Sequence, residues 1–395
     1  MPGTLPEKVP GTFSGGWYTR PVTLASLRTP CVLVDQQKLE RNIERMQAAA
    51  DARRIRLRPH AKTHKSPDLA RIQIARGAVG ICCAKLGEAE VFAVAGIEDI
   101  RVPYPLNPVN AARVLTLLDR TKLSFIVDHL DVAREWSRMV NEAGRTVDVL
   151  VKVDVGFHRC GIDPEAANAV EFVTRVAELP GLALRGLLSH AGHAYGAGSE
   201  GETAEIAAAE ARLLSALSDK VSHAGVRLEE ISVGSTPTAR FSVREDGITE
   251  IRPGNYVYYD RTQVGLGSAS WEDCALTVLS RVVSRPAADR VILDAGSKTL
   301  TTDLARGAGD VSGYGAVLES LDVARPDHNL LVERLSEEHA TVRVRAGEAA
   351  LKPGDLVRLV PNHACVVSNL MDEIWLVNGN VAVDRIDVAA RGRIQ

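Results

Sequence analysis

The sequence predicts an α/β protein in which a (β/α)8 TIM-type barrel precedes a C-terminal antiparallel β domain. Two observations support this fold class. From residue 29 to about residue 260, short apolar runs rich in β-branched residues alternate with helical patterns, which is typical of a parallel sheet covered on both faces. Beyond residue 260 the apolar runs follow one another over short spans, separated by Gly, Asp and Asn, as in an antiparallel domain.

The first apolar run covers residues 31–35. A helix with one apolar face follows it, because Leu39, Ile43, Met46 and Ala50 recur at helical spacing. We interpret this run as a strand that precedes the barrel. Eight further runs match the strand count of a closed barrel, and they begin at residues 55, 80, 100, 123, 148, 184, 230 and 250. An open doubly wound sheet is the alternative, but no glycine fingerprint follows the first strand.

The change of pattern after residue 260 divides the chain into segments. We expect residues 29–265 to form the barrel and residues 266–395 to form the β domain. Residues 1–28 are rich in Pro and Gly, and we expect this segment to pack against the β domain.

Composition restricts the class of protein. Of the 395 residues, 45% are hydrophobic and 25% charged, which is ample for a large core and excludes a disordered chain. The net charge is −3 without a dense basic run, so neither nucleic acid nor a membrane is an expected partner. The six cysteines form no CxxC pair, and the first 20 residues lack the apolar core of a signal peptide. We therefore expect a cytoplasmic protein that acts on a small molecule.

Reactive side chains of barrel enzymes lie at the C-terminal ends of the strands. Lys62 follows the first barrel strand and is a candidate Schiff-base nucleophile, since burial and neighbouring cations can make a lysine amine reactive. An exposed lysine in a basic loop is the alternative. His60 and His64 lack the glutamate of a HExxH helix and follow a strand, so a zinc site is not expected there.

Small residues follow the seventh and eighth strands. Gly234, Ser235 and Thr236 end one strand, and Gly254 and Asn255 end the next. Free backbone N–H groups at these two strand ends suit a phosphate, which barrels commonly bind at this position. Two tight turns are the alternative.

His363 and Cys365 stand between two strand patterns of the β domain. If the segment is extended, their side chains point to the same side and both can ligate one soft or borderline metal ion. A buried structural pair is the alternative.

Nine motifs occur along the chain in a fixed order. They are RPHAKTHK, GICCAKLGEAE, DVGFHRCG, SHAGHAY, SVGSTPT, RPGNYVYYD, LDAGSK, RLSEEH and PNHAC. In this combination the chain resembles the D-threonine aldolase/D-serine dehydratase group of pyridoxal-phosphate enzymes, which are relatives of alanine racemase (fold type III). The resemblance extends from about residue 29 to the C-terminus. It implies a homodimer, a pyridoxal 5'-phosphate cofactor and a divalent metal (Mn2+, Mg2+ or Zn2+).

The resemblance also assigns roles to residues. It implies that Lys62 binds the cofactor covalently, that Arg159 lies near the phenolic oxygen of the cofactor, and that His363 and Cys365 bind a metal beside the β-hydroxyl of the substrate. The remaining expected cofactor-binding residues are His60, Tyr195, Gly234, Ser235, Thr236, Gly254, Asn255 and Tyr256.

The same constellation permits two lyase reactions on β-hydroxy-D-amino acids. Retro-aldol cleavage of a D-threonine-like substrate gives glycine and an aldehyde, and dehydration gives a 2-oxo acid and ammonia. Lys62 or His193 is the expected proton carrier, with His190 and Tyr195 in reserve.

The choice between the reactions rests on resemblance. The His-x-Cys pair and SHAGHAY are similar to the dehydratase pattern, whereas many sequences of this overall type are regarded as D-threonine aldolases. We expect the aldolase, with the dehydratase as the alternative. A racemase or a non-catalytic cofactor carrier ranks third. Carriers are typically single domains, whereas this chain has an additional β domain. A racemase needs a second base, and the motifs SEEH and NHAC occur where that base is expected.

Overall fold

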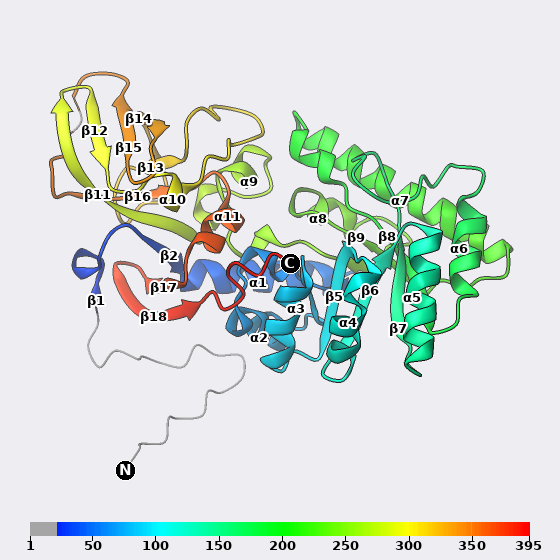
Figure 1. Cartoon of the computed structure of the whole chain (residues 1–395). Helices are drawn as coiled ribbons and strands as arrows, with labels where there is room; N and C mark the ends of the chain where they lie inside the picture. Colours follow the sequence, from blue (N-terminus) through cyan, green and yellow to red (C-terminus); the bar gives the residue numbers. More distant parts are fainter. Residues whose placement is uncertain (1–21, 349) are drawn as a thin grey trace, which may run out of the picture.

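Eight parallel strands form the barrel of the computed structural model, which describes residues 22–348 and 350–395 (Figure 1). The strands pair in the order β3-β10-β9-β8-β7-β6-β5-β4, and a parallel bridge between His60 and Cys82 joins the two ends. Their bounds are β3 (Arg56–Leu57), β4 (Ile81–Cys82), β5 (Asp99–Pro105), β6 (Lys122–Val127), β7 (Val147–Lys152), β8 (Leu182–Leu188), β9 (Glu230–Val233) and β10 (Glu250–Ile251). The predicted barrel of eight strands is confirmed.

Helices cover the outside of the barrel, and several of them have one apolar face. In α5, Ala133, Trp136 and Val140 recur at helical spacing and are buried, and Trp136 Nε1 donates to the carbonyl oxygen of Leu106 at 2.9 Å. The α-helices of the barrel part are α1 (Gln36–Asp51), α2 (Pro67–Ala75), α3 (Leu86–Val94), α4 (Ala111–Leu118), α5 (Leu130–Glu142), α6 (Ala169–Ala177), α7 (Glu200–His223), α8 (Thr236–Ser242) and α9 (Arg261–Gly265).

Short 3-10 helices occupy several connections. Three of them carry residues of the candidate site: η2 (Ala61–Thr63), η4 (Gly192–Gly196) and η5 (Asn255–Val257). The others are η1 (Leu24–Ser26), η3 (Pro108–Asn110) and η6 (Trp271–Asp273).

The second domain is a ten-stranded sheet, antiparallel except where β2 pairs with β17. Its strands are β1 (Val22–Thr23), β2 (Cys31–Asp35), β11 (Leu276–Ala287), β12 (Arg290–Leu293), β13 (Ala316–Leu318), β14 (Pro326–Leu335), β15 (Ala340–Val344), β16 (Leu356–Val360), β17 (Glu373–Asn378) and β18 (Val381–Asp387). Because β11 also pairs with β16, six strands form a closed barrel in the order β11-β12-β15-β14-β13-β16. The helices α10 (Ser297–Leu300) and α11 (Ala364–Leu370) lie in connections of this domain.

The structure corrects the expected start of the barrel at residue 29. Strand β2 lies in the sheet of the β domain, between β11 and β17, and α1 then leads to the barrel. The physical reason is that Val32, Leu33 and Val34 are all buried, so this strand needs cover on both of its faces. Strand β1 pairs with β18 in the same sheet, whereas the expectation for residues 1–21 lies outside the described residues.

The two domains share one continuous core. A single cluster of buried apolar side chains contains Leu57 and Phe125 of the barrel together with Leu276 and Val360 of the β domain. Within the parts of the chain that the structure describes, no helix combines the length and apolar character that crossing a membrane requires.

Charged side chains fill part of the barrel interior. Glu250 is fully buried and accepts hydrogen bonds from Arg58 (2.9 Å), from Arg101 and from Ser232. Burial alone would raise the pKa of Glu250, but Arg101 and Arg58 outweigh it and lower the pKa to about 2. The buried carboxylate therefore stays charged and cross-links β5, β9 and β10 with Arg58, the residue that follows β3.

Candidate active site

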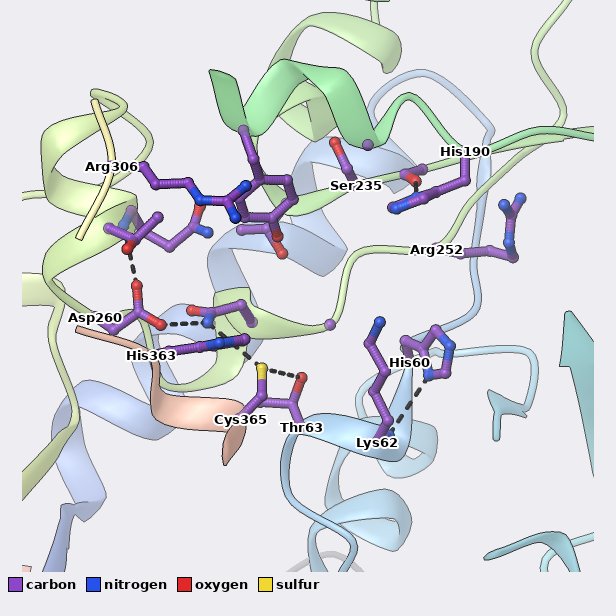
Figure 2. A pocket seen from close by; sticks show the side chains of 18 of the residues that line it. His60, Lys62, Thr63, His190, Ser235, Arg252, Asp260, Arg306, His363 and Cys365 are labelled. Carbon is purple, nitrogen blue, oxygen red and sulfur yellow. Dashed lines mark hydrogen bonds between the residues drawn. The ribbon is translucent and has the colours of Figure 1, made fainter. Parts of the chain in front are cut away.

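A cavity of about 800 Å³ lies where the C-terminal ends of the barrel strands meet the β domain (Figure 2). The barrel contributes His60, Lys62, Thr63, Pro103, Lys152, Phe157, Arg159, Leu188, His190, Gly192, Tyr195, Gly234, Ser235, Thr236, Arg252, Gly254, Asn255, Asp260, Thr262 and Gln263. The β domain contributes Thr302, Asp303, Leu304, Ala305, Arg306, His363 and Cys365. Most of the residues expected from the sequence therefore meet in one place.

Lys62 projects from η2 into this cavity (Figure 2). Its amine forms no hydrogen bond or ion pair with any residue that the structure describes, as a nucleophile requires. His60 precedes it, and the His60 Nδ1 accepts from the Lys62 backbone N–H at 3.5 Å. Burial, together with the charges of Lys62 and Arg252, lowers the pKa of His60 well below its usual value, so this ring is neutral.

Backbone from two strand ends forms the cradle expected for a phosphate. Gly234 and Gly254 both line the cavity, and neither has room for a side chain. A Cβ on Gly234 would lie 2.8 Å from the backbone nitrogen of Arg252, and a Cβ on Gly254 would lie 2.9 Å from Thr63 Oγ1. Ser235, Thr236 and Asn255 line the same region. The small residues thus leave backbone groups open to the cavity, which fits a phosphate.

His190 lines the cavity as a neutral ring with a defined tautomer. Its Nδ1 lies 2.5 Å from the Gly234 carbonyl oxygen, and because a carbonyl only accepts, the proton is on Nδ1. Burial and the nearby Lys62 charge lower the pKa of His190 well below its usual value. The Nε2 atom is therefore free to accept a proton.

Two expected site residues do not line the cavity: His193 and Tyr256. On the 3-10 helix η4, residues three apart share a face, so Gly192 and Tyr195 face the cavity whereas His193 points elsewhere, beside Gly156. Tyr256 is fully buried, and its hydroxyl accepts from Gln73 at 2.9 Å. The structure thus places His193 and Tyr256 outside the lining of the cavity, and their expected roles stay predictions.

The remaining expected residues, Arg159 and Tyr195, do line the cavity. The Arg159 guanidinium lies 5.1 Å from the centre of the Phe157 ring. Burial raises the pKa of Tyr195 above its usual value, so this phenol remains protonated at neutral pH.

His363 and Cys365 lie together at the start of α11, not on the extended segment that the sequence suggested. His363 is the N-cap of this helix and is extended, and the Ala364 N–H donates to Asp260 Oδ2 at 2.9 Å. Both side chains line the cavity next to Lys62, because Cys365 Sγ is 3.3 Å from Thr63 Oγ1 (Figure 2).

This pair has the chemistry of a metal site. Burial opposes charge on both groups, but their mutual interaction outweighs it, raising the pKa of His363 to about 10 and lowering that of Cys365. The lowered pKa of Cys365 favours the thiolate, the form that binds metals. Among the described residues, no group of three or more His, Cys, Asp and Glu side chains is placed to hold a metal.

Asp303 holds the ring of His363 in place. Its Oδ2 lies 2.6 Å from His363 Nδ1, which leaves Nε2 directed away from this contact. In metal proteins a carboxylate in this position fixes the tautomer and orientation of a ligand histidine.

Lys65 connects the two sides of the site. Its Nζ lies 3.1 Å from Glu88 Oε1 on α3 of the barrel and 2.7 Å from Asn369 Oδ1 on α11 of the β domain. Lys65 and Glu88 are both buried, so the ion pair is shielded from water. The contact fixes α11 next to η2.

Five charged residues of the cavity were not among the expected site residues: Lys152, Arg252, Asp260, Asp303 and Arg306. Lys152 and Arg252 lie at or just beyond strand ends, so the rule that located Lys62 also applies to them. Burial, followed by the charge of Arg252, lowers the pKa of Lys152 to about 8. Asp303 and Arg306 lie in a loop of the β domain, where the sequence carries no comparable signal.

Two known families match the chain. The alanine racemase N-terminal domain matches residues 34–262, and a serine dehydratase domain matches residues 275–377. The chain is 34% identical to a D-threonine aldolase of Arthrobacter sp., over 93% of this chain and 94% of that protein. It is also 34% identical to a D-threo-3-hydroxyaspartate dehydratase of Delftia sp. (strain HT23), over 87% of this chain and 92% of that protein.

Solved structures share the fold. A D-threo-3-hydroxyaspartate dehydratase with a cysteine replaced by alanine, in the metal-free form, has a TM-score of 0.87 at 30% identity and covers 93% of this chain and 98% of that one. The D-threonine aldolase of Filomicrobium marinum has a TM-score of 0.85 at 28% identity and covers 95% of this chain and 98% of that one. An aldolase and a dehydratase thus match this structure about equally well.

Proposed function

The chain belongs to the family of alanine racemase-like lyases that includes D-threonine aldolases and D-serine and hydroxyaspartate dehydratases, and from this premise we propose that it is a pyridoxal-phosphate- and metal-dependent lyase of β-hydroxy-D-amino acids. The reaction we propose is retro-aldol cleavage of a D-threonine-like substrate to glycine and an aldehyde. The single observation that carries the proposal is the contact of Thr63 with Cys365. This contact brings the Lys62 amine and the pair of His363 and Cys365 into one cavity.

The cavity residues fit the cofactor. Lys62 would hold it covalently, the backbone at Gly234 and Gly254 would bind its phosphate, and Arg159 would lie near its phenolic oxygen. When bound, pyridoxal phosphate supplies an electron sink for negative charge at Cα of an amino acid. His60 contributes no charge there, because its ring is neutral.

The pair of His363 and Cys365 fits a divalent metal. When bound, the ion supplies a positive charge that lowers the pKa of a hydroxyl group. Asp303 orients His363 through Nδ1, so that Nε2 and the Cys365 sulfur are the two ligand atoms that the chain would offer the ion.

Two groups in the cavity can move protons. The Lys62 Nζ has no partner in the described parts of the chain, and the neutral His190 presents an unprotonated Nε2. We propose that they carry the proton of Cα. In dehydration Cα loses this proton, and after retro-aldol cleavage Cα gains it. His193 has no part in this proposal, because it does not line the cavity.

Dehydration to a 2-oxo acid and ammonia is the second candidate. The observation that favours it is the presence of Cys365 beside His363 in the cavity, since the His-x-Cys pair resembles the dehydratase side of the family. The 34% identity to the Delftia dehydratase supports it equally.

We also propose a homodimer that works in the cytoplasm. Phe157 and Leu304 line the cavity and are 38% and 63% exposed, which is unusual for apolar side chains beside an active site. A second copy of the chain would cover them. Analytical ultracentrifugation of the purified protein tests the dimer, and a monomer at micromolar concentration would refute it.

The experiment that tests the lyase is product analysis by NMR. Purified protein is incubated with pyridoxal phosphate, Mn2+ and D-threonine. Glycine and acetaldehyde are the expected products. 2-Oxobutyrate and ammonia would establish the dehydratase, L-allo-threonine (inversion at Cα alone) would indicate a racemase, and unchanged D-threonine would favour a carrier.

A further inference from the structure

Arg306 brings a guanidinium group into the cavity from the β domain. Its side chain points into the cavity (Figure 2) and lines it together with His363 and Cys365. It forms no hydrogen bond or ion pair with any part of the chain that the structure describes. A charged donor in this position is open to a ligand.

The backbone fixes the position of Arg306. A Cβ on Gly265 would lie 2.3 Å from the Arg306 carbonyl oxygen, so these two segments pack directly on each other. The Ala308 N–H donates to the Gly265 carbonyl oxygen at 2.9 Å, and the preceding Ala305 is buried. Packing on both sides therefore fixes the backbone position from which the Arg306 side chain extends.

The charges around the cavity call for an anionic ligand. Two carboxylates line it, and both already have partners: Asp303 contacts His363, and Asp260 accepts from Asn255 and from the Ala364 N–H. Five cationic side chains line the same cavity: Lys62, Lys152, Arg159, Arg252 and Arg306. Lys62 and Arg159 are assigned to the cofactor, Lys152 donates to the Val153 carbonyl oxygen and Arg252 donates to Ser232, so Arg306 is the cation of this set with neither an assigned role nor a hydrogen-bond partner among the described residues.

Arg306 lies on the side of the cavity where a substrate would place its β-carbon. Asp303, three residues earlier in the same loop, contacts His363, so loop and candidate metal ligands lie together. On the proposed function, His363 and Cys365 face the β-hydroxyl of the substrate. The second substituent of the β-carbon is bonded to the same atom, so it would lie close to this loop. A guanidinium binds a carboxylate through two parallel hydrogen bonds.

We propose that Arg306 binds a carboxylate on the β-carbon of the substrate, so that the preferred substrate class is 3-hydroxy-D-aspartate rather than D-threonine. This inference rests on the proposed function and names its substrate. Retro-aldol cleavage then breaks the Cα–Cβ bond, the hydroxyl loses its proton as glyoxylate forms, and Cα takes up a proton to give glycine.

The test compares binding of two amino acids that cannot be cleaved because they lack a β-hydroxyl. D-Aspartate and D-2-aminobutyrate differ in carrying a carboxylate or a methyl group on the β-carbon. Their dissociation constants are measured by calorimetry on cofactor-loaded wild-type protein, Arg306→Gln and Arg306→Lys, with Arg53→Gln as a matched surface control. Affinity for pyridoxal phosphate is measured on the same variants.

We expect wild-type protein to bind D-aspartate about 10- to 100-fold more tightly than D-2-aminobutyrate, as a hydrogen-bonded charge pair provides. Arg306→Gln should remove this difference by weakening D-aspartate alone, Arg306→Lys should retain part of it, and Arg53→Gln should retain all of it. Equal weakening of both ligands would assign Arg306 to the α-carboxylate and overturn the proposal. Weakened pyridoxal phosphate with unchanged ligand preference would assign Arg306 to the phosphate and also overturn it, as would no change at all.

Turnover separates this inference from the proposed function. With 3-hydroxy-D-aspartate and D-threonine as substrates, Arg306→Gln should lose about 10- to 100-fold in kcat/KM for the first and little for the second. If wild-type protein acts on D-threonine and its kcat/KM is no higher for 3-hydroxy-D-aspartate, the role of Arg306 is refuted and the proposed lyase stands. Wild-type protein that cleaves or dehydrates neither substrate refutes the proposed lyase, whereas the binding preference still tests Arg306.

Discussion

Replacing Asp303 with asparagine should weaken metal binding without removing a metal ligand. The contact between Asp303 Oδ2 and His363 Nδ1 is 2.6 Å long, and a charged hydrogen bond of this kind contributes about 1.5–3 kcal/mol. The two side chains are 44% and 42% exposed, so water screens the contact and the lower limit applies. About 1.4 kcal/mol corresponds to a tenfold loss of Mn2+ affinity.

The assay is a titration of cofactor-loaded protein with Mn2+, in which the free ion is followed by electron paramagnetic resonance. Asp131→Asn is the matched control, because Asp131 is 75% exposed on α5 and contacts only Arg134 among the described ion pairs. His363→Ala gives the loss expected for a missing ligand. An affinity of Asp303→Asn within twofold of wild type would refute the orienting role. A loss as large as that of His363→Ala would make Asp303 a ligand, which also contradicts the reasoning.

Three further predictions follow from the structure. Lys62→Ala should remove the visible absorbance that the protein acquires with pyridoxal phosphate, because no other described lysine offers an unpartnered amine in the cavity. Glu250→Gln should lower the free energy of unfolding by about 3 kcal/mol in urea denaturation, because Arg58 and Arg101 each lose one of two carboxylate partners and keep only Asp99 and Glu230. Burial lowers the pKa of His64 from 6.5 to about 4, so between these values the unfolded chain binds a proton that the folded chain does not. Stability should therefore fall as the pH drops from 6.5 to 4, by about 1.4 kcal/mol per pH unit for this group, and His64→Gln should make the fall shallower.

Each of these predictions has a contrary outcome. An unchanged spectrum of Lys62→Ala would assign the cofactor to another amine. A Glu250→Gln variant as stable as wild type would show that the buried charges are hydrated or rearranged. Urea midpoints of wild type and His64→Gln that fall in parallel between pH 6.5 and pH 4 would contradict a neutral buried His64.

The sequence predicts the barrel because each of its strands is a short apolar run bounded by a helical pattern. The same periodicity cannot tell which sheet a strand joins, and β2 therefore belongs to the β domain although it precedes a barrel helix. Pairing partners of β2 lie more than 200 residues away on β11 and β17, beyond the reach of local patterns.

The candidate site was predictable where residues follow strands directly. Lys62, Gly234 and Gly254 line the cavity as expected. His193 does not, because the 3-10 helix η4 sets the direction of its side chain, and a reading of strand ends does not reveal that turn. Arg306 could not be found at all from the sequence, since only the packing of its loop on Gly265 brings it to the cavity.

The contacts of Lys65 with Glu88 on α3 and with Asn369 on α11 join parts of the chain that are synthesised at different times. Thr63 and Cys365, which meet beside the lysine, are 302 positions apart in the chain. During synthesis the barrel lysine therefore emerges long before α11 and Cys365, and the contact of Lys65 with Asn369 forms only after both have been made. Closing so long a loop is slow compared with local folding, so the chemistry of the site is assembled among the last events of folding.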